Sequence, residues 1–294
     1  MANQRLTNIF FQKQKTDLNQ FAFRLLSEPY GDLSMGEVIM DLLIPIYVDI
    51  VPDLYWSLRR YIRSLLGNLQ IDDVYVIEFG KRFTKIRLRG KDAQIAQTFL
   101  TKLFGTQRLL TSLKKEEEYS GRVVSIDDNE ILVDIGISDK DVLISIQLET
   151  FLSRILGKVK KIDTENSKLL MKYLGIAKYF PFTVKIKQDI KENNLRKING
   201  DVGERTARLF NRWREQKLER VIVYGATRSQ VERALRKSKC TGYIITVERL
   251  GFLEHAIVCK KKILATEIIK RIGPFLWGVK LLPFSPRNIL RFKQ

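Results

Sequence analysis

Histidine and cysteine are nearly absent from this chain, which has one histidine and two cysteines among 294 residues. Cys240 and Cys259 lie nineteen positions apart and form no C-x-x-C unit, so the composition excludes zinc fingers and zinc ribbons. A catalytic site of the Ser–His–Asp or Cys–His type would have to use His255. His255 follows Glu254 in a predicted strand, where neighbours point to opposite faces, and we interpret it as a structural or surface residue.

Catalytic and phosphate-cradling motifs are also missing. No Gly-x-x-x-x-Gly-Lys segment occurs, and no spacing of carboxylates or lysines selects an acid–base pair. The acidic pairs Asp72-Asp73 and Asp127-Asp128 have the context of turns and helix caps. We therefore expect a protein without enzymatic activity that needs no metal and no cofactor.

Long apolar runs are lacking as well. The longest, Val38 to Val51, is interrupted by Asp41, Pro45 and Asp49, whereas a membrane-spanning helix needs roughly 20 apolar residues. The amino terminus has neither the apolar segment nor the small-residue cleavage site of a signal peptide. We expect a cytoplasmic protein with no membrane partner.

Positive charge is abundant, and it is concentrated in one region. Residues 191–294 hold 24 Lys and Arg against 9 Asp and Glu, whereas residues 1–190 hold 28 against 24. The formal net charge of +19 therefore belongs mainly to the last third of the chain. A concentrated basic field attracts polyanions and binds them by releasing their condensed counterions, so RNA is the favoured partner.

Hydrophobic periodicity divides the chain into three domains and two terminal segments. Residues 1–36 are predicted to form an arm with one helix near Leu18–Leu26. Residues 37–113 show a β-α-β-β-α order, and a last strand at Leu109–Leu113 would complete a ferredoxin-like domain. The expected elements are strand Val38–Val48, helix Pro52–Leu69, strands Asp73–Phe79 and Arg82–Leu88, and helix Asp92–Phe104.

Residues 118–190 have the element order of an S1/OB-like barrel with a helical insertion. The expected strands are Tyr119–Ile126, Ile131–Ile137, Val142–Ile146 and Phe182–Lys187, with helices at Leu148–Leu156 and Thr164–Lys178. A fifth strand is not recognisable. The polar segment 189–201, which ends in Asn199-Gly200, is interpreted as a linker.

Residues 202–288 predict a second, basic ferredoxin-like domain, followed by a basic tail at 289–294. A helix at Gly203–Leu218 precedes a complete β-α-β-β-α-β order, in which Thr227 and Gln230 fit a capping box. The expected elements are strands Arg220–Tyr224, Tyr243–Glu248, Leu253–Lys260 and Val279–Phe284, with helices from Arg228 to Lys239 and from Leu264 to Leu276. The fold class predicted for the whole chain is α+β.

Three groups of residues resemble an archaeal domain-of-unknown-function family, number 2110. They are Gly90–Ala96 with Leu103-Phe104-Gly105, then Leu132–Gly136, and finally Gly251–Lys260 with Phe284–Arg287. The resemblance covers Val38 to Arg287 and implies an archaeal source but no established activity. The middle domain is also similar to the S1 group of OB folds, which implies RNA binding. It departs from that group because Ile131–Gly136 and Val142–Ile146 lack the aromatic side chains that stack on bases.

Three basic groups are candidate RNA-binding residues. They are Arg205, Arg208 and Arg212 on one helix; Arg228, Arg233, Arg236, Lys237 and Lys239 on the next; and Lys260, Lys261 and Lys262 at a strand-to-helix turn, with Arg287 near the tail. The alternative for the helical groups is a solvated face whose arginine stems cover apolar surface. The strand that contains His255 lacks the ring pair of an RNA-recognition motif, which favours helix and loop contacts to phosphates over base stacking on the sheet.

These observations predict a non-enzymatic RNA-binding protein. We expect ribosomal or another structured RNA, contacted through its phosphates, and by analogy a translation- or ribosome-associated role with ribosomal proteins as further partners. Two alternatives remain open. One is an RNA-processing or RNA-modifying enzyme with an unrecognised site, and the other is a homodimeric protein-interaction scaffold formed by edge-to-edge sheets.

Overall fold

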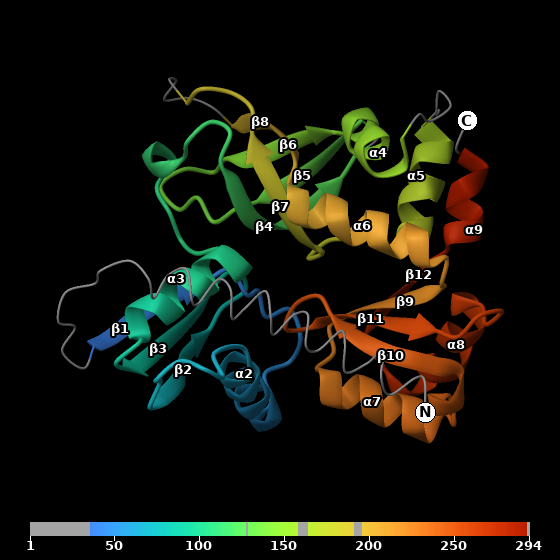
Figure 1. Ribbon diagram of the computed structural model, residues 1–294, viewed down its shortest axis with the longest axis horizontal. Coiled ribbons are helices and arrows are strands. Elements are labelled where there is room, and N and C mark those ends of the chain that lie inside the picture. The colour runs from blue at the N-terminus through green and yellow to red at the C-terminus, as the bar shows by residue number, and fades with distance from the viewer. Residues whose placement is uncertain (1–35, 128, 158–163, 191–195, 293–294) are drawn as a thin grey trace.

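The computed structural model describes residues 36–127, 129–157, 164–190 and 196–292 (Figure 1). The predicted arm lies outside these ranges except for Gly36, which begins β1. Of the predicted tail 289–294 only the last two residues lie outside, and Leu290–Phe292 forms a 3₁₀ helix, η4. The fold is α+β, as predicted, with a three-stranded sheet, a closed five-stranded barrel and a four-stranded sheet along the chain. Figure 1 shows the barrel lying over both sheet domains. In the described part of the chain no helix has the length and apolarity needed to cross a membrane.

The amino-terminal domain packs two helices on one face of a small sheet. Its elements are β1 Gly36–Leu42, α2 Pro52–Leu65, β2 Asp73–Phe79, β3 Thr84–Gly90 and α3 Ala93–Phe104, with strand order β1-β3-β2. The alternation in β3 determines its two faces, because Thr84, Ile86 and Leu88 are buried while the intervening basic residues face outward.

The predicted last strand of this domain, Leu109–Leu113, is wrong. Leu110–Ser112 forms a 3₁₀ helix, η1. Leu110 and Leu113 are buried in the core of the barrel rather than against the sheet. An apolar run of five residues predicts burial, but it does not determine which neighbouring core accepts the side chains.

The fifth strand of the barrel, which could not be recognised in the sequence, is Lys197–Val202. Its strands are β4 Glu118–Ile126, β5 Glu130–Asp134, β6 Leu143–Gln147, β7 Pro181–Ile186 and β8 Lys197–Val202, in the order β4-β5-β6-β8-β7. The β6–β8 pair is parallel and the other pairs are antiparallel. Helices α4 Leu148–Leu156 and α5 Thr164–Tyr173 lie between β6 and β7 in the chain.

The interpretation of residues 189–201 as a linker is therefore corrected, since β8 begins at Lys197 and the barrel extends to Val202. Asn199-Gly200 has the composition of a turn but lies inside this strand. The backbone of Gly200 lies so close to the side chain of Ile144 that no larger residue fits, because a Cβ there would lie 2.4 Å from the Cγ2 of Ile144. Polar strand residues beside a glycine explain why the fifth strand was not recognised.

The carboxy-terminal domain has the predicted β-α-β-β-α-β order. Helix α6 Glu204–Gln216 leads into β9 Arg220–Tyr224, α7 Arg228–Lys237, η2 Thr241–Tyr243, β10 Ile244–Arg249, β11 Glu254–Cys259, α8 Ala265–Ile272, η3 Gly273–Phe275 and β12 Lys280–Phe284, followed by α9 Pro286–Ile289. The strand order is β10-β11-β9-β12, with all pairs antiparallel. The capping box predicted for Thr227 and Gln230 is confirmed at the start of α7.

Both faces of this four-stranded sheet are covered. One face forms a core with α7 and α8 that includes Val223 and Ile257. The other face, with Ile222 and Ala256, belongs to the same hydrophobic cluster as the barrel interior. Helix α6 lies between the barrel and this sheet in Figure 1, and its buried side chains contact both.

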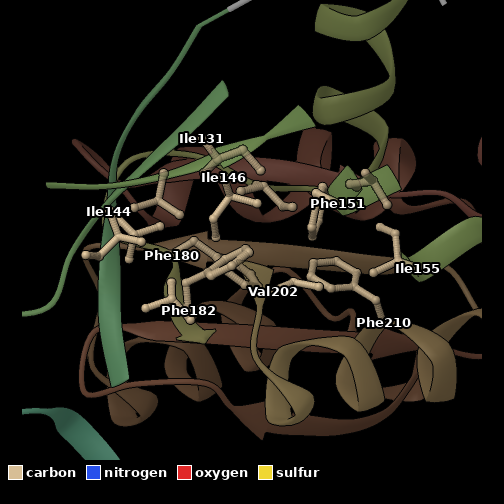
Figure 2. Packing of buried hydrophobic residues seen from close by; sticks show 14 of the residues in the cluster. Ile131, Ile144, Ile146, Phe151, Ile155, Phe180, Phe182, Val202 and Phe210 are labelled. Atoms are coloured by element: carbon tan, nitrogen blue, oxygen red, sulfur yellow. The ribbon is translucent and has the colours of Figure 1, made fainter. Parts of the chain in front are cut away.

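Aromatic rings on α6 join the barrel core to the sheet. Figure 2 shows Phe210 of α6 among the barrel residues Phe180 and Phe182 and near Phe151 of α4. The ring centroid of Phe210 is 5.7 Å from that of Phe180 and 5.9 Å from that of Phe151. Trp213, one turn further along α6, is fully buried and lies 5.0 Å from the ring of Phe284 in β12. The barrel and the carboxy-terminal sheet therefore share one core.

A buried ion pair connects all three domains. The Arg122 guanidinium in β4 lies 2.9 Å from the Glu254 carboxylate in β11, and both side chains are at least 95% buried. The hydroxyl of Tyr47, which follows β1 in the chain, donates to the other Glu254 oxygen at 2.6 Å. Tyr47 also stacks on Tyr179, which precedes β7, with centroids 4.0 Å apart. Burial and the Glu254 carboxylate raise the pKa of Tyr47 above its usual range, so this phenol stays a donor.

Glu254→Gln is expected to destabilise the fold strongly. The substitution leaves the Arg122 charge buried without its partner, and breaking a buried pair in this way costs about 3–5 kcal/mol. Urea unfolding followed by tryptophan fluorescence measures the loss. Glu232→Gln is the matched control, because Glu232 pairs with Arg228 at 2.8 Å on the partly exposed surface of α7 and its loss should cost about 0.5 kcal/mol or less. Equal effects of the two substitutions would contradict a structural role for the buried pair.

Candidate nucleic-acid interface

The first basic group, on α6, is engaged by neighbouring protein groups. Arg205 donates to the backbone oxygen of Leu103 in α3 at 3.1 Å. Arg208 pairs with Glu204 at 3.2 Å, and Arg212 lies 3.6 Å from Glu248 of β10. The spacing correctly puts the three arginines on one side of α6, but each has an acceptor within the protein. This group is therefore the weakest of the predicted phosphate sites.

The second basic group, on α7, divides into two parts. Arg228 lies at the start of the helix and pairs with Glu232 at 2.8 Å. Arg233, Arg236 and Lys237 are exposed, because Val231, Ala234 and Leu235 face the core as predicted. Lys239 is also exposed and stops the helix with a left-handed backbone, φ 56°. Over the ranges that the structure describes, none of these four cations pairs with a carboxylate.

The fold brings the third basic group against the end of α7. The backbone N–H of Cys240 donates to Leu235 in α7, that of Tyr243 to Cys240, and that of Lys260 to Tyr243, each at 2.9 Å. These hydrogen bonds connect the end of α7, near Lys239, to the turn that carries Lys260, Lys261 and Lys262. All three lysines are exposed. We call the combined surface the basic end. It consists of seven residues: Arg233, Arg236, Lys237, Lys239, Lys260, Lys261 and Lys262.

Tyr243 is an aromatic residue at the basic end that sequence reasoning overlooked. Its side chain is 39% exposed, and the guanidinium of Arg271 in α8 lies 5.3 Å from its ring centroid. Arg271 lies in the last turn of α8, where a cation also interacts favourably with the helix dipole. An aromatic residue at the first position of a predicted strand, between two lysine-rich segments, was the available signal.

Arg287 lies apart from the basic end. It is exposed on α9, which Figure 1 shows beside α5 at the barrel. The twelve predicted residues thus fall into one cluster of seven, one engaged group on α6, and two separate arginines, Arg228 and Arg287.

The sheet of the carboxy-terminal domain cannot serve as a base-stacking platform. Every residue of β9 and β11 is buried. The hydroxyl of Tyr224 donates to Gly175 at 2.6 Å and accepts from Ala177 at 3.1 Å, so this ring is fixed in the core. Phe252 is buried against Tyr61 of the amino-terminal domain. Tyr224 and Phe252 lie near the strand positions that carry the base-stacking rings in an RNA-recognition motif.

The barrel face formed by β5 and β6 is also unsuited to nucleic acid. It carries no aromatic residue, and Asp134 accepts two hydrogen bonds of 2.7 Å from the Arg82 guanidinium of the amino-terminal domain. A cleft of about 320 Å³ on the other side of the barrel is lined by charged side chains. Within it Glu116 pairs with Lys185 and Lys187, which lower the pKa of that carboxyl group.

The exposed face of the amino-terminal sheet has balanced charge. Each basic residue of β3 faces a neighbour on both adjacent strands: Glu37–Arg89–Asp73, Ile39–Arg87–Tyr75 and Asp41–Lys85–Glu78. The Arg87 guanidinium lies 4.8 Å from the ring centroid of Tyr75. Because four carboxylates surround three cations, this face does not attract a polyanion as the basic end does.

His255 is fully buried on β11. Burial, with the nearby cations Arg249 and Arg228, lowers the pKa of His255 to about 3. A weak polar contact with the Leu253 backbone opposes this shift but falls outside hydrogen-bond geometry, and in the described structure neither ring nitrogen has a partner. Nowhere in the described ranges do three His, Cys, Asp or Glu side chains form a group that could hold a metal.

Comparison with known protein families gives a match in the carboxy-terminal domain. Residues 218–282 match the family model described as the DUF2110 C-terminal domain. The matched segment begins just before β9, ends within β12 and contains the whole basic end. It supports the family that the sequence resembles and names no activity. Comparison with curated proteins gives no match.

His255→Leu is expected to flatten the acid dependence of stability. The imidazole stays neutral in the folded chain down to about pH 3 but protonates near pH 6.5 when unfolded. Stability should therefore fall by up to about 1.4 kcal/mol per pH unit below pH 6.5 on account of this group, and the Leu variant should lack that component. Urea unfolding at several pH values from 7 to 5 measures the difference. Parallel profiles for the two proteins would show that His255 is protonated in the fold.

Proposed function

We propose that this chain, whose carboxy-terminal domain matches that of the DUF2110 family, is a non-enzymatic RNA-binding protein that contacts phosphates through its basic end. One observation carries the proposal. Seven exposed cations lie on two segments of the chain that backbone hydrogen bonds bring together, and no carboxylate pairs with any of them in the described structure. Like charges on neighbouring segments repel one another, and a bound polyanion relieves the repulsion.

The remaining charge of the molecule supports this location. The exposed cations of α6 have acceptors within the protein, and those of the amino-terminal sheet alternate with carboxylates. A phosphate backbone would therefore meet its strongest field at the basic end. Arginine and lysine side chains on a helix face and a turn suit contacts that fix position on the backbone and carry no base readout.

RNA is the polyanion that the architecture favours. We infer that the five-stranded barrel, with its parallel β6–β8 closure, is of the S1/OB type, and that the two sheet domains are ferredoxin-like. Both kinds of domain are common in RNA-binding proteins, although neither fold implies a function alone. In this chain the barrel supports the basic domain through the shared core. We infer recognition of ribosomal or another structured RNA, with a cytoplasmic, translation- or ribosome-associated role in an archaeal cell.

Replacing Lys260, Lys261 and Lys262 together by Glu should weaken RNA binding by about 100-fold or more, because three phosphate contacts become repulsive. Fluorescence anisotropy of a labelled RNA hairpin, titrated at several salt concentrations, measures the change. The slope of log affinity against log salt should also become shallower by about 2. The same hairpin, recovered intact after incubation, excludes turnover by an unrecognised active site.

Lys81, Lys91 and Lys172 provide the matched control. All three are exposed on the amino-terminal domain and α5, and replacing them by Glu changes the net charge by the same amount. The control variant should retain most of the affinity. If both variants lost affinity equally, binding would depend on overall charge and the basic end would not be the site. Unchanged affinity in the first variant would remove it from the interface.

A further inference from the structure

Trp277 is the most exposed large hydrophobic residue in the described part of the chain. Its side chain is 96% exposed, whereas the next, Ile50, is 62% exposed. Isolated apolar residues on a surface are ordinary, but an indole with almost no protein contact is not, since tryptophan is largely buried in most folds. Neither the basic groups nor the shared core accounts for this ring.

The loop that carries Trp277 holds the ring outward. Pro274 lies in the first turn of η3, and the N–H of Leu276 donates to Gly273 at 3.0 Å. Leu276 is only 5% exposed and anchors the loop in the core of the domain. Gly278 then has φ 73°, a left-handed conformation that only glycine adopts easily, and the chain enters β12. A buried residue before Trp277 and a turn after it leave the indole no place in the core.

Cations flank this loop on both sides. Lys270 and Arg271 precede it, Lys280 follows it, and all three are exposed. Glu267 is the only acidic residue in the sequence after Glu254. Lys280 pairs with Tyr224 at one end of β9, whereas Lys260 follows β11 at the Arg220 end, so the loop and the basic end lie at opposite ends of the sheet. Arg271 of α8 spans part of this distance, because its guanidinium lies over the ring of Tyr243.

We infer that Trp277 stacks on an unpaired base of an RNA strand whose phosphates lie on the basic end. This inference rests on the proposed function and adds a substrate class, RNA with accessible single-stranded bases. An aromatic face combined with cations along which the backbone can run, here Lys270, Arg271 and Lys280, is the arrangement that binds single strands without sequence readout. The exposed Trp277 ring has enough area to stack on one base. Insertion into a lipid bilayer would need more exposed apolar side chains, and here Leu276 is buried and Phe275 is only 45% exposed.

The test uses the full chain and two RNA probes, a labelled oligouridine about twelve nucleotides long and a labelled RNA duplex with the same number of phosphates. A duplex keeps its bases stacked, so it reports phosphate contacts alone. Trp277→Ala should weaken oligouridine binding by about tenfold and leave duplex binding unchanged. Trp56→Ala is the control, because Trp56 is 54% exposed on the amino-terminal domain and its loss should change neither.

Intrinsic fluorescence gives a second readout in a Trp56→Phe background. Only Trp213, which is fully buried, and Trp277 then remain. Oligouridine should quench the emission, the duplex should quench it far less, and Trp277→Phe should abolish the difference. Trp277 is so exposed that its substitution should leave the thermal midpoint unchanged, which separates a lost contact from a lost fold.

The possible outcomes separate base stacking by Trp277 from phosphate binding by the basic end. If Trp277→Ala binds oligouridine as the parent does while the triple lysine variant fails, stacking is wrong and the basic end stands. If the parent binds neither probe, both proposals fail together. If emission shifts to the blue with anionic phospholipid vesicles and is not quenched by oligouridine, the loop contacts lipid and the inference is overturned.

Discussion

Burial of the second face of the carboxy-terminal sheet is the constraint on which the rest of the structure depends. Ile222 and Ala256 on this face share one core with the barrel, and Phe210 and Trp213 of α6 fill the space between them. At the edge of this contact the buried pair of Arg122 and Glu254 meets the hydroxyl of Tyr47. Three small domains are thereby fixed as one body, and the sheet that resembles a base-binding platform is closed.

Because both faces of the carboxy-terminal sheet are covered, a polyanion has to bind elsewhere. The surface best suited to it is the one whose cations have no carboxylate partners in the described structure. Some of the described surface cations lie beside carboxylates, either across strands, as in the amino-terminal sheet, or within the barrel cleft around Glu116. The basic end lacks that compensation, and it lies on the part of the domain remote from the shared core. The basic end and the shared core are thus separate parts of the molecule, so substitutions in the basic end do not disturb the core.

Element types were largely predictable from the sequence, because alternation in β3, the Thr227 capping box and apolar spacing in α7 are local signals. The sequence did not allow us to predict which elements pair or pack with each other. The strand β8 contains Asn199-Gly200, and the leucines at 110 and 113 fill the barrel core rather than extend a sheet. The basic groups were found, but spacing could not show that Glu248 lies beside Arg212 or that Arg220 is buried, where burial lowers its pKa to about 10.

Ultraviolet crosslinking of the full chain to a uridine-containing RNA, followed by mass spectrometry of the modified peptides, tests the central claim most directly. It needs no substitution and reports every exposed ring at once. The closed sheet and the uncompensated charge predict crosslinks on the peptides that contain Tyr243, Lys260–Lys262 and Trp277. Crosslinks concentrated on Tyr75 and Trp56 of the amino-terminal domain, or on Tyr224 of the closed sheet, would contradict the account.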